Sequence, residues 1–340
     1  MTVGAHDRVP TAQAAALPPR VRPGDLVGVI APSGPPLEAP LQRGLAALAS
    51  TFRVQVAKSA LAPQPPPHAP YLAADDDTRA AELTAMLKDP DVRAIIMARG
   101  GYGLLRILPA LDPALLRSDP KPIVGFSDGT ALLAWAFAAG VRGIHGQVAV
   151  RLGAERPEAA FDLSRALTDP TPMGRMDWPL RSAPVARRAE AGPGGEDTAP
   201  RDVTGPMFPA NLVMTSHLLG TPWALPLAEA TWWIEEVGER PYELDRYLTH
   251  LHLAGALRAL RGVLIGDLTY CMDPLPGAGA IDDPTSAVAT VLERLQSFGV
   301  PALHGAHFGH GRYNPPLPFG ARCRLDFTAG TVEILDGAVA

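Results

Sequence analysis

Cysteine is scarce in this chain of 340 residues, which contains only Cys271 and Cys323. The two lie far apart and neither belongs to a C-x-x-C motif, so the sequence indicates neither a disulfide scaffold nor a cysteine-ligated metal site. So few cysteines fit a reducing compartment, and we expect a cytoplasmic protein. No pattern in the chain predicts a cofactor or a metal ion.

An excess of positive charge and a long apolar run are also lacking. The formal net charge is -5, whereas nucleic-acid-binding proteins usually carry a basic surface, so we expect no nucleic-acid partner. No run approaches the roughly 18 apolar residues of a membrane span, and the N-terminus lacks the charged and then apolar segments of a signal peptide. We therefore expect no membrane partner.

What the chain does contain is enough apolar sequence for two well-packed domains. Hydrophobic residues make up 47% and charged residues 19% of its length, as in soluble proteins with a substantial core. Composition and pattern together divide the chain into a disordered leader at 1–20, an N-terminal domain at 21–165, a linker or exposed hairpin at 166–205 and a C-terminal domain at 206–340.

Strands and helices alternate in the first half. Short apolar runs at 26–30, 52–56, 92–98, 122–126 and 143–145 indicate strands, and the segments between them have helical patterns, including one Leu-rich helix after Gly103. This alternation predicts an α/β fold with a parallel sheet wound on both faces, whose ligands bind beyond the carboxyl ends of the strands. The second half mixes strands at 230–234 and 262–265 with helices at 211–219, 242–253 and 284–298.

The most informative segment is Gly125-Phe126-Ser127-Asp128-Gly129, which joins a predicted strand to a predicted helix. A G-x-S-x-G turn of this kind exposes the serine hydroxyl at the carboxyl end of a sheet, beside a helix N-terminus that favours negative charge. We interpret Ser127 as a candidate nucleophile and the backbone N–H of Asp128 as a donor to an oxyanion. The alternative is that Ser127 only caps the helix.

Two other segments carry candidate catalytic groups. An apolar strand ends in Glu235-Glu236, where a half-buried carboxylate could orient a histidine, although a solvated turn with capping acids also explains the pair. His304, His307 and His310 recur at three-residue spacing, which is a pattern seen in metal sites. The stretch is rich in glycine rather than helical, however, and has no neighbouring cysteine. A general base at His310 fits this context better.

Five motifs in order resemble a known family. They are Arg99-Gly100-Gly101-Tyr102-Gly103, Gly125-Phe126-Ser127-Asp128, Ile144-His145-Gly146, Ile234-Glu235-Glu236-Val237-Gly238-Glu239 and Phe308-Gly309-His310-Gly311. Their order and spacing are similar to those of the LD-carboxypeptidase family of serine peptidases, which includes muramoyltetrapeptide carboxypeptidases and microcin C immunity proteins. The likeness extends from about residue 23 to residue 325.

The resemblance implies a role for each matching residue. Ser127 matches the family's nucleophile, Glu235 its second triad member and His310 its general base, while the backbone N–H groups of Asp128 and Gly101 match its oxyanion donors. It also implies a homodimer of chains with a Rossmann-like N-terminal domain and a smaller, mixed α/β C-terminal domain. Weaker candidates for binding the substrate's carboxylate or backbone are Arg99, Tyr102 and Asn211.

The chain departs from the family pattern at three places. The family has Gly-Gly-Asn-Leu where this chain reads Phe208-Pro209-Ala210-Asn211-Leu212, so Asn211 is kept and the glycines are lost. His145-Gly146-Gln147 stands where the family has His-Gly-Pro, and the acidic pair is Glu-Glu rather than Glu-Asp. None of these changes removes a triad residue, so we expect hydrolysis to be retained. The departures bear instead on the choice of substrate.

The sequence and the resemblance together predict a serine carboxypeptidase. Its expected partner is a small peptide, a murein tetrapeptide from which the enzyme releases a C-terminal D-amino acid during cell-wall recycling. One alternative is a hydrolase of acyl-aminoacyl nucleotides of the microcin-immunity type. For that role Trp232 and Trp233 could be cited as stacking partners of a base, but neighbouring strand residues face opposite ways and both fit a core better. A second alternative is a non-catalytic binding protein with the same fold.

Overall fold

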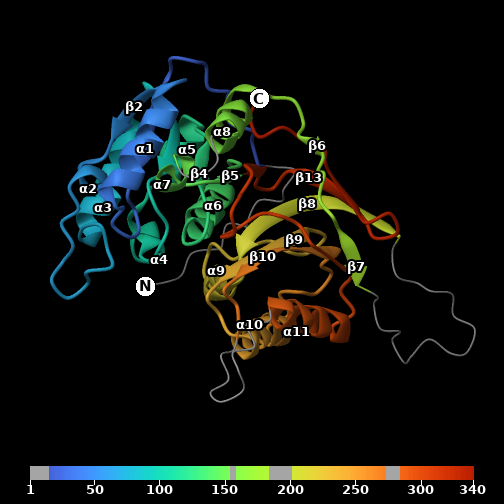
Figure 1. Cartoon of the computed structure of the whole chain (residues 1–340). Coiled ribbons are helices and arrows are strands. Elements are labelled where there is room, and N and C mark those ends of the chain that lie inside the picture. Colours follow the sequence, from blue (N-terminus) through green and yellow to red (C-terminus); the bar gives the residue numbers. More distant parts are fainter. Residues whose placement is uncertain (1–14, 154–157, 184–200, 273–283) are drawn as a thin grey trace, which may run out of the picture.

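The computed structural model describes residues 15–153, 158–183, 201–272 and 284–340. Within these ranges the strands form two sheets, one of six strands and one of eight. Figure 1 shows the first sheet with its helices on the left and the second, strongly curled sheet on the right. The predicted α/β architecture, with a parallel sheet followed by a mixed one, is confirmed. In the described parts of the chain, no helix is both long and apolar enough to span a bilayer.

The first sheet has the strand order β12-β5-β4-β3-β1-β2. Its strands are β1 (Leu26–Ile30), β2 (Arg53–Val56), β3 (Val92–Met97), β4 (Ile123–Gly125), β5 (Ile144–His145) and β12 (Leu317–Pro318). β1 to β5 are parallel, and β12 pairs antiparallel with β5. The winding direction reverses between β1 and β3, and in doubly wound sheets ligands bind beyond the strand ends at such a point.

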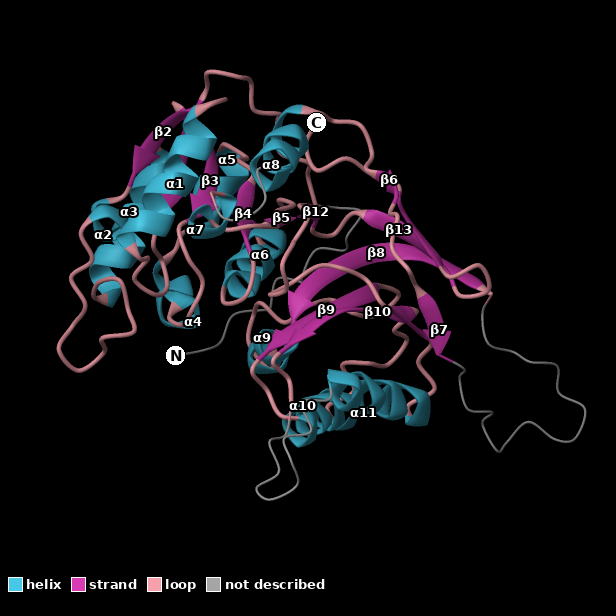
Figure 2. Cartoon of the chain, in the orientation of Figure 1, coloured by secondary structure: helices cyan, strands magenta, loops and turns pink. Residues whose placement is uncertain are grey.

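Helices cover both faces of this sheet, as Figure 2 shows. They are α1 (Glu38–Ala49), α2 (Lys58–Leu61), α3 (Asp76–Lys88), α4 (Leu104–Ile107), α5 (Pro113–Ser118), α6 (Gly129–Ala138), α7 (Ala149–Leu152) and α8 (Glu158–Thr168), with a 3₁₀ turn η2 (Leu108–Ala110). Alternate residues of β3 enter different cores, because successive strand side chains point to opposite faces. Ala94 and Ile96 pack with α1, α7 and α8, whereas Ile95 and Met97 pack with α3, α4 and α6.

The second sheet has the order β6-β14-β13-β8-β9-β10-β11-β7. These strands are β6 (Gly174–Arg175), β7 (Arg181–Ala183), β8 (Asp202–Asn211), β9 (Thr231–Val237), β10 (Gly262–Thr269), β11 (Ala302–His304), β13 (Arg322–Asp326) and β14 (Thr331–Ile334). The central strands β8 to β11 are parallel and the outer ones antiparallel. α9 (Leu212–Leu218), α10 (Pro241–Leu253) and α11 (Pro284–Ser297) lie on one side of this sheet (Figure 1).

Two predicted boundaries are wrong. Residues 15–20 do not belong to a disordered leader, because Ala16 pairs with Val141 and the N–H of Arg20 donates to the carbonyl of Ala340 (3.0 Å). The segment 166–205 is not a simple linker, because it supplies the end of α8, both β6 and β7, and the start of β8. Residues 1–14 and the Gly-rich centre of the expected hairpin lie outside the described residues.

The expected Leu-rich helix after Gly103 is also divided. Its length is covered by α4, the 3₁₀ turn and α5 in succession. Pro109 lies in the 3₁₀ turn and Pro113 opens α5. A proline lacks the N–H of a helical hydrogen bond and its ring obstructs the preceding turn, so a continuous helix cannot form across both positions.

The two sheets share one hydrophobic core. Phe137 of α6 packs edge-on against Phe208 of β8, with ring centroids 5.1 Å apart, and against Phe319. All three rings are buried. Phe208 therefore fills the contact between two structural units, each formed by one sheet and its helices. The backbone of the C-terminal residue Ala340 returns to the first unit through its hydrogen bonds to Pro18 and Arg20.

Candidate active site

Ser127 occupies a strained turn between β4 and α6. Its φ is 61°, in the left-handed region that side chains other than glycine seldom adopt. The glycines on either side allow this turn: a Cβ at Gly125 would lie 2.5 Å from the sulfur of Met97, and one at Gly129 would lie 2.8 Å from it. The tight turn leaves the Ser127 side chain partly exposed beyond the end of β4.

His310 and Glu235 extend from Ser127 as a chain of hydrogen bonds. Nε2 of His310 lies 3.0 Å from Oγ of Ser127, and Nδ1 of the same ring lies 2.6 Å from Oε2 of Glu235. Ser127 follows β4 of the first sheet, Glu235 belongs to β9 of the second, and His310 follows β11. The structure therefore brings together three residues that the sequence spreads over 183 positions.

Strand geometry separates the roles of the two acids in β9. Successive side chains of a strand face opposite sides of the sheet. Trp233 and Glu235 share one side, and Glu235 meets His310 there. Trp232 and Glu236 share the other, where Oε2 of Glu236 accepts the N–H of Val213 (2.9 Å). Both tryptophans are fully buried, as expected for core residues.

The charges around His310 favour its protonated form. Burial by itself lowers the pKa of His310, but the charge of Glu235 and its hydrogen bond to the ring outweigh burial and hold the pKa above its usual value. The Glu235 side chain is completely buried, so its attraction for the imidazolium is little screened by solvent. Such a pair can accept a proton from a hydroxyl and stabilise the resulting charge.

Glycine at position 309 permits the close approach of His310 to Glu235. Gly309 has a φ of 116°, and a Cβ there would lie 2.6 Å from Cβ of Glu235. Its N–H donates to Oδ1 of Asn314 (2.9 Å), which also contacts Nε2 of His145 at 3.2 Å. His145 is fully buried, and burial lowers its pKa to about 4, so it is neutral and structural.

The loops after β1, β3 and β4 meet beside Ser127. The carboxylate of Asp128 accepts the Ser33 hydroxyl (2.6 Å) and the N–H of Leu104 (3.0 Å), and burial raises its pKa. Gly100 lies directly against the nucleophile candidate, because a Cβ there would be 3.3 Å from Oγ of Ser127. Among the hydrogen bonds of the described residues, none uses the N–H of Asp128 or of Gly101 as its donor.

The three weaker candidates have different surroundings. Arg99 is exposed and donates to the carbonyl of Pro35 (2.7 Å). Tyr102 is 50% exposed and its ring meets that of Tyr71 edge-on at 5.7 Å. Asn211 is buried: its Oδ1 caps α9 and its Nδ2 donates to Glu236 (2.9 Å). Both ends of its amide already have a partner inside the protein, and its contact with substrate stays a prediction.

Sequence reasoning missed Arg151 and Asp267, which surround the His310 loop. Arg151 in α7 donates from Nη1 to the His310 carbonyl (3.2 Å) and from Nη2 to the Gly311 carbonyl. The N–H of Asp267 in β10 donates to the carbonyl of Phe308 (2.9 Å). Neither residue belongs to a motif or pattern that would have singled it out.

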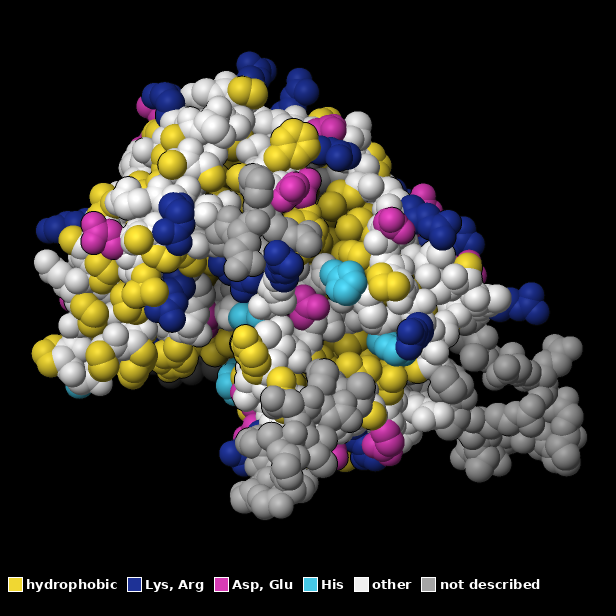
Figure 3. Space-filling model, viewed as in Figure 1, with side chains coloured by type: hydrophobic (Ala, Val, Ile, Leu, Met, Phe, Trp, Pro, Cys, Tyr) yellow, Lys and Arg dark blue, Asp and Glu magenta, His cyan; other side chains and the backbone are white. Residues whose placement is uncertain are grey.

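In the described parts of the chain, no three His, Cys, Asp or Glu side chains lie close enough together to bind a metal ion. His304 lies in β11 and His307 is exposed, so the three-residue spacing does not gather the histidines. On the face drawn in Figure 3, basic and acidic side chains are interspersed.

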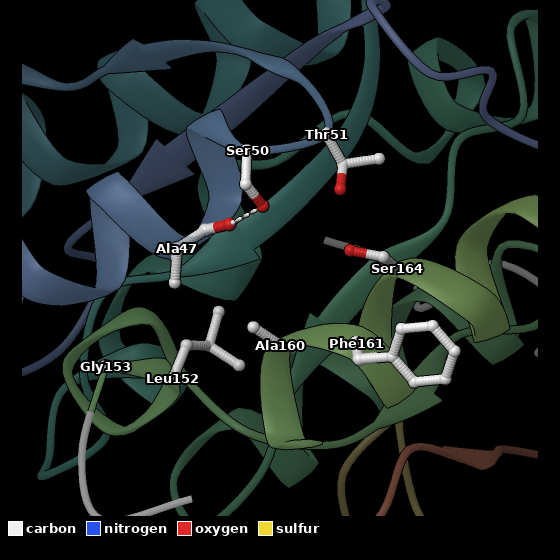
Figure 4. A pocket seen from close by; sticks show the side chains of 8 residues that line it. All are labelled: Ala47, Ser50, Thr51, Leu152, Gly153, Ala160, Phe161 and Ser164. Carbon is white, nitrogen blue, oxygen red and sulfur yellow. Dashed lines mark hydrogen bonds between the residues drawn. The ribbon is translucent and has the colours of Figure 1, made fainter. Parts of the chain in front are cut away.

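A separate pocket of about 380 Å³ lies where α1, α7 and α8 meet. Figure 4 shows its lining of small and apolar side chains with three hydroxyls: Ala47, Ser50, Thr51, Leu152, Gly153, Ala160, Phe161 and Ser164. The Ser50 hydroxyl is already used, since it donates to the carbonyl of Ala47 (2.7 Å). None of the candidate catalytic residues lines this pocket.

Comparison with known proteins shows the family of the chain. Residues 27–146 match the model of the LD-carboxypeptidase N-terminal domain, and residues 204–325 match that of the C-terminal domain. A Streptomyces coelicolor protein named provisionally as a carboxypeptidase is 34% identical over 328 residues, covering 93% of this chain and 95% of its own. The murein tetrapeptide carboxypeptidase of Pseudomonas aeruginosa is 30% identical, over 75% of this chain and 80% of its own.

A solved structure has the same fold. The microcin C7 self-immunity protein MccF, in complex with aspartyl sulfamoyl adenosine, superposes with a TM-score of 0.77 over 96% of this chain and 100% of its own, at 20% identity. The matched domains, the coverage of the relatives and the order of the motifs agree with one another. The chain belongs to the LD-carboxypeptidase family of peptidases.

Proposed function

We propose that this protein is a serine LD-carboxypeptidase that releases a C-terminal D-amino acid from murein tetrapeptide during cell-wall recycling. The observation that carries the proposal is the pair of contacts from Glu235 through His310 to Ser127, at 2.6 and 3.0 Å. The choice of substrate is supported by the Pseudomonas aeruginosa relative, whose name states that it acts on murein tetrapeptide.

In this mechanism Oγ of Ser127 attacks the carbonyl carbon of the amide that precedes the terminal D-alanine. Nε2 of His310 accepts the serine proton, while Glu235 holds Nδ1–H and stabilises the imidazolium. The imidazolium then protonates the departing amine of D-alanine. A water molecule, deprotonated by the same histidine, hydrolyses the acyl-enzyme and restores Ser127.

Two backbone N–H groups are proposed to bind the oxyanion of each tetrahedral intermediate. That of Asp128 lies at the start of α6, where the helix dipole favours negative charge. That of Gly101 lies in the loop whose Gly100 packs against Ser127. We also propose that Arg99, adjacent to this loop, binds the terminal carboxylate of the peptide, with Tyr102 beside it.

The test is release of D-alanine from purified murein tetrapeptide by the wild type and by Ser127→Ala. We expect release by the wild type and a loss of at least about 10³-fold in the variant, because the nucleophile of the acyl-enzyme is removed. Ser118→Ala is the matched control, since its exposed hydroxyl bonds only to the carbonyl of Leu115 (3.1 Å). A tetrapeptide ending in L-alanine should not be cleaved.

A second candidate function is hydrolysis of an acyl-aminoacyl nucleotide, as in microcin immunity. It is favoured by the likeness of fold to MccF and by the half-exposed rings of Tyr71 and Tyr102, which could stack on a base. Cleavage of an aspartyl-adenylate analogue but not of tetrapeptide would support it. Binding of either compound without cleavage by the folded wild type would support a non-catalytic binding protein instead.

We further propose that the protein acts in the cytoplasm as a homodimer. The two cysteines are buried free thiols, which fits a reducing compartment, and the dimer is an expectation from the family. Light scattering after size-exclusion chromatography tests the second point. A dimer has twice the 35.8 kDa mass of one chain, and a mass of one chain at micromolar concentration would contradict it.

A further inference from the structure

The loop that carries His310 is held from both structural units. Its own unit contributes β10, where the N–H of Asp267 donates to the Phe308 carbonyl (2.9 Å). The carboxylate is packed onto Gly311, since a Cβ there would lie 2.2 Å from Oδ2 of Asp267. These contacts fix the backbone on both sides of His310.

The other unit contributes Arg151, the third residue of the short helix α7. Its guanidinium donates to the carbonyls of His310 (3.2 Å) and Gly311, so it binds the backbone of the catalytic loop itself. It also lies over the ring of Phe126, 6.0 Å from the centroid, and that ring is 4.9 Å from the imidazole of His310. Arg151 therefore contacts both the loop of the base and the residue that precedes the nucleophile.

α7 provides a rigid support for this arginine. The N–H of Val150 donates to the carbonyl of Ala98 at the end of β3 (3.0 Å). α1 packs on α7 so closely that a Cβ at Gly44 would lie 1.8 Å from the carbonyl oxygen of Ala149. A planar guanidinium presents several donors in a fixed geometry, which suits the bridging of two adjacent carbonyls.

We infer that Arg151 is a positioning residue that, with Asp267, clamps the His310 loop across the two units so that the imidazole faces Ser127. The inference rests on the proposed function, in which His310 is the general base. The clamp explains how a base on one unit stays in register with a nucleophile on the other. A shift of about 1 Å between reacting groups can lower a rate by about 100-fold.

The test compares Arg151→Met, Arg151→Gln and Arg151→Lys with the wild type in D-alanine release. We expect kcat to fall by about 100-fold in the methionine variant with KM changed by less than about twofold. Lysine, which keeps the charge and a donor, should recover at least about tenfold of that loss. Arg261→Met is the matched control, because Arg261 also donates to a backbone carbonyl, that of Thr204 (2.6 Å), far from the site.

A second readout separates positioning from general stability. The titratable and charged groups around His310 and its loop are Glu235 and Glu236 on β9, Asp267 on β10, Arg151 on α7 and the neutral His145 on β5. Burial raises the pKa of Asp267 to about 6. The positive charge of Arg151 lowers the pKa of His310, so the methionine variant should move the acid limb of kcat/KM to higher pH. Lysine should leave that limb where the wild type has it.

Several outcomes would overturn the proposed role of Arg151. Unchanged kcat in the methionine variant, or an equal loss in Arg261→Met, would overturn the clamp. If the methionine variant does not fold, the glutamine variant replaces it with the same expected loss. If the wild type releases no D-alanine, the proposed function fails, and NMR titration of His310 still tests the clamp. A His310 pKa and line width identical in wild type and Arg151→Gln would then refute it.

Discussion

Glu236 should make the protein less stable as the pH rises from about 5 to about 8. Its carboxyl is buried between β9 and α9, and burial, followed by the charge of Glu235, raises its pKa from 4.5 to about 7. Three donors, the N–H groups of Val213 and Val237 and the amide of Asn211, partly offset this effect. The folded protein therefore holds a proton that the unfolded chain releases in the window between these two pKa values.

The sign and size follow from proton linkage. Where the native state binds more protons than the unfolded state, stability decreases with rising pH. A pKa of about 7 in the native state against 4.5 unfolded gives a loss of about 2–3 kcal/mol in the free energy of unfolding between about pH 5 and about pH 8. The loss ends above the native pKa.

Glu236→Gln removes this pH dependence because glutamine does not ionise. The variant should carry a constant penalty of about 1–3 kcal/mol, because its NH₂ group faces donors in either orientation. In the place of Oε2 it opposes the N–H of Val213, and in the place of Oε1 it opposes the N–H of Val237 and the side-chain amide of Asn211. Urea unfolding at about pH 5 and about pH 8, followed by the fluorescence of buried tryptophans, measures both proteins. The wild type should lose about 2–3 kcal/mol relative to the variant on going to the higher pH. An equal difference at both pH values would refute the reasoning.

Two further predictions concern Glu235 and the loop that carries His310. Glu235→Gln should lower kcat by about 10³–10⁴-fold and move the acid limb of the remaining activity to lower pH. Burial lowers the pKa of His310, and the variant lacks the charge of Glu235 that opposes this effect. An acid limb at the wild-type pH would contradict the conclusion that Glu235 raises the pKa of His310. Gly309→Ala should abolish D-alanine release, because its Cβ would lie 2.6 Å from Glu235. Gly238→Ala, with a φ of 77° and open space around its Cβ, should cost only about 1 kcal/mol of stability and keep activity.

The regular elements of the fold were predictable because their signal is local. β1, β3 and β4 are apolar runs buried on both faces. Asp75 precedes α3, and its side chain caps the helix by accepting the N–H of Thr78 (2.7 Å). Such strands and caps depend on a few adjacent residues, so they can be recognised without knowing the partners of each strand.

The elements that were missed depend on distant partners. β6 and β12 contain two residues each, and they are strands only because β14 and β5 lie beside them. Residues 15–20 look like a polar, Ala- and Pro-rich tail, yet their backbone groups pair with Val141 and Ala340. In a chain with 37 prolines, the two that divide the predicted helix after Gly103 are weak signals individually.

The same contrast applies to the site. Ser127, Glu235 and His310 could be selected because each lies in a short motif whose residues constrain one another, as Gly309 constrains the approach to Glu235. Arg151 could not, because its function in the structure is to reach two backbone carbonyls, and a carbonyl has no sequence signature. Asn211 fits a family motif, but the motif does not reveal its partners in the fold. Its side chain donates to Glu236 and caps α9 by accepting the N–H of Met214.

The candidate triad residues come from two different sheets, so the fold must hold the two sheets in a fixed relative position. Ser127 is held by a strained turn in the first sheet, and Glu235 by a buried strand in the second. Neither element can adjust by much, because the turn is packed on Met97 and the strand is paired on both sides. His310 lies in a loop six residues beyond the end of β11, so its position has to be fixed by contacts from both units.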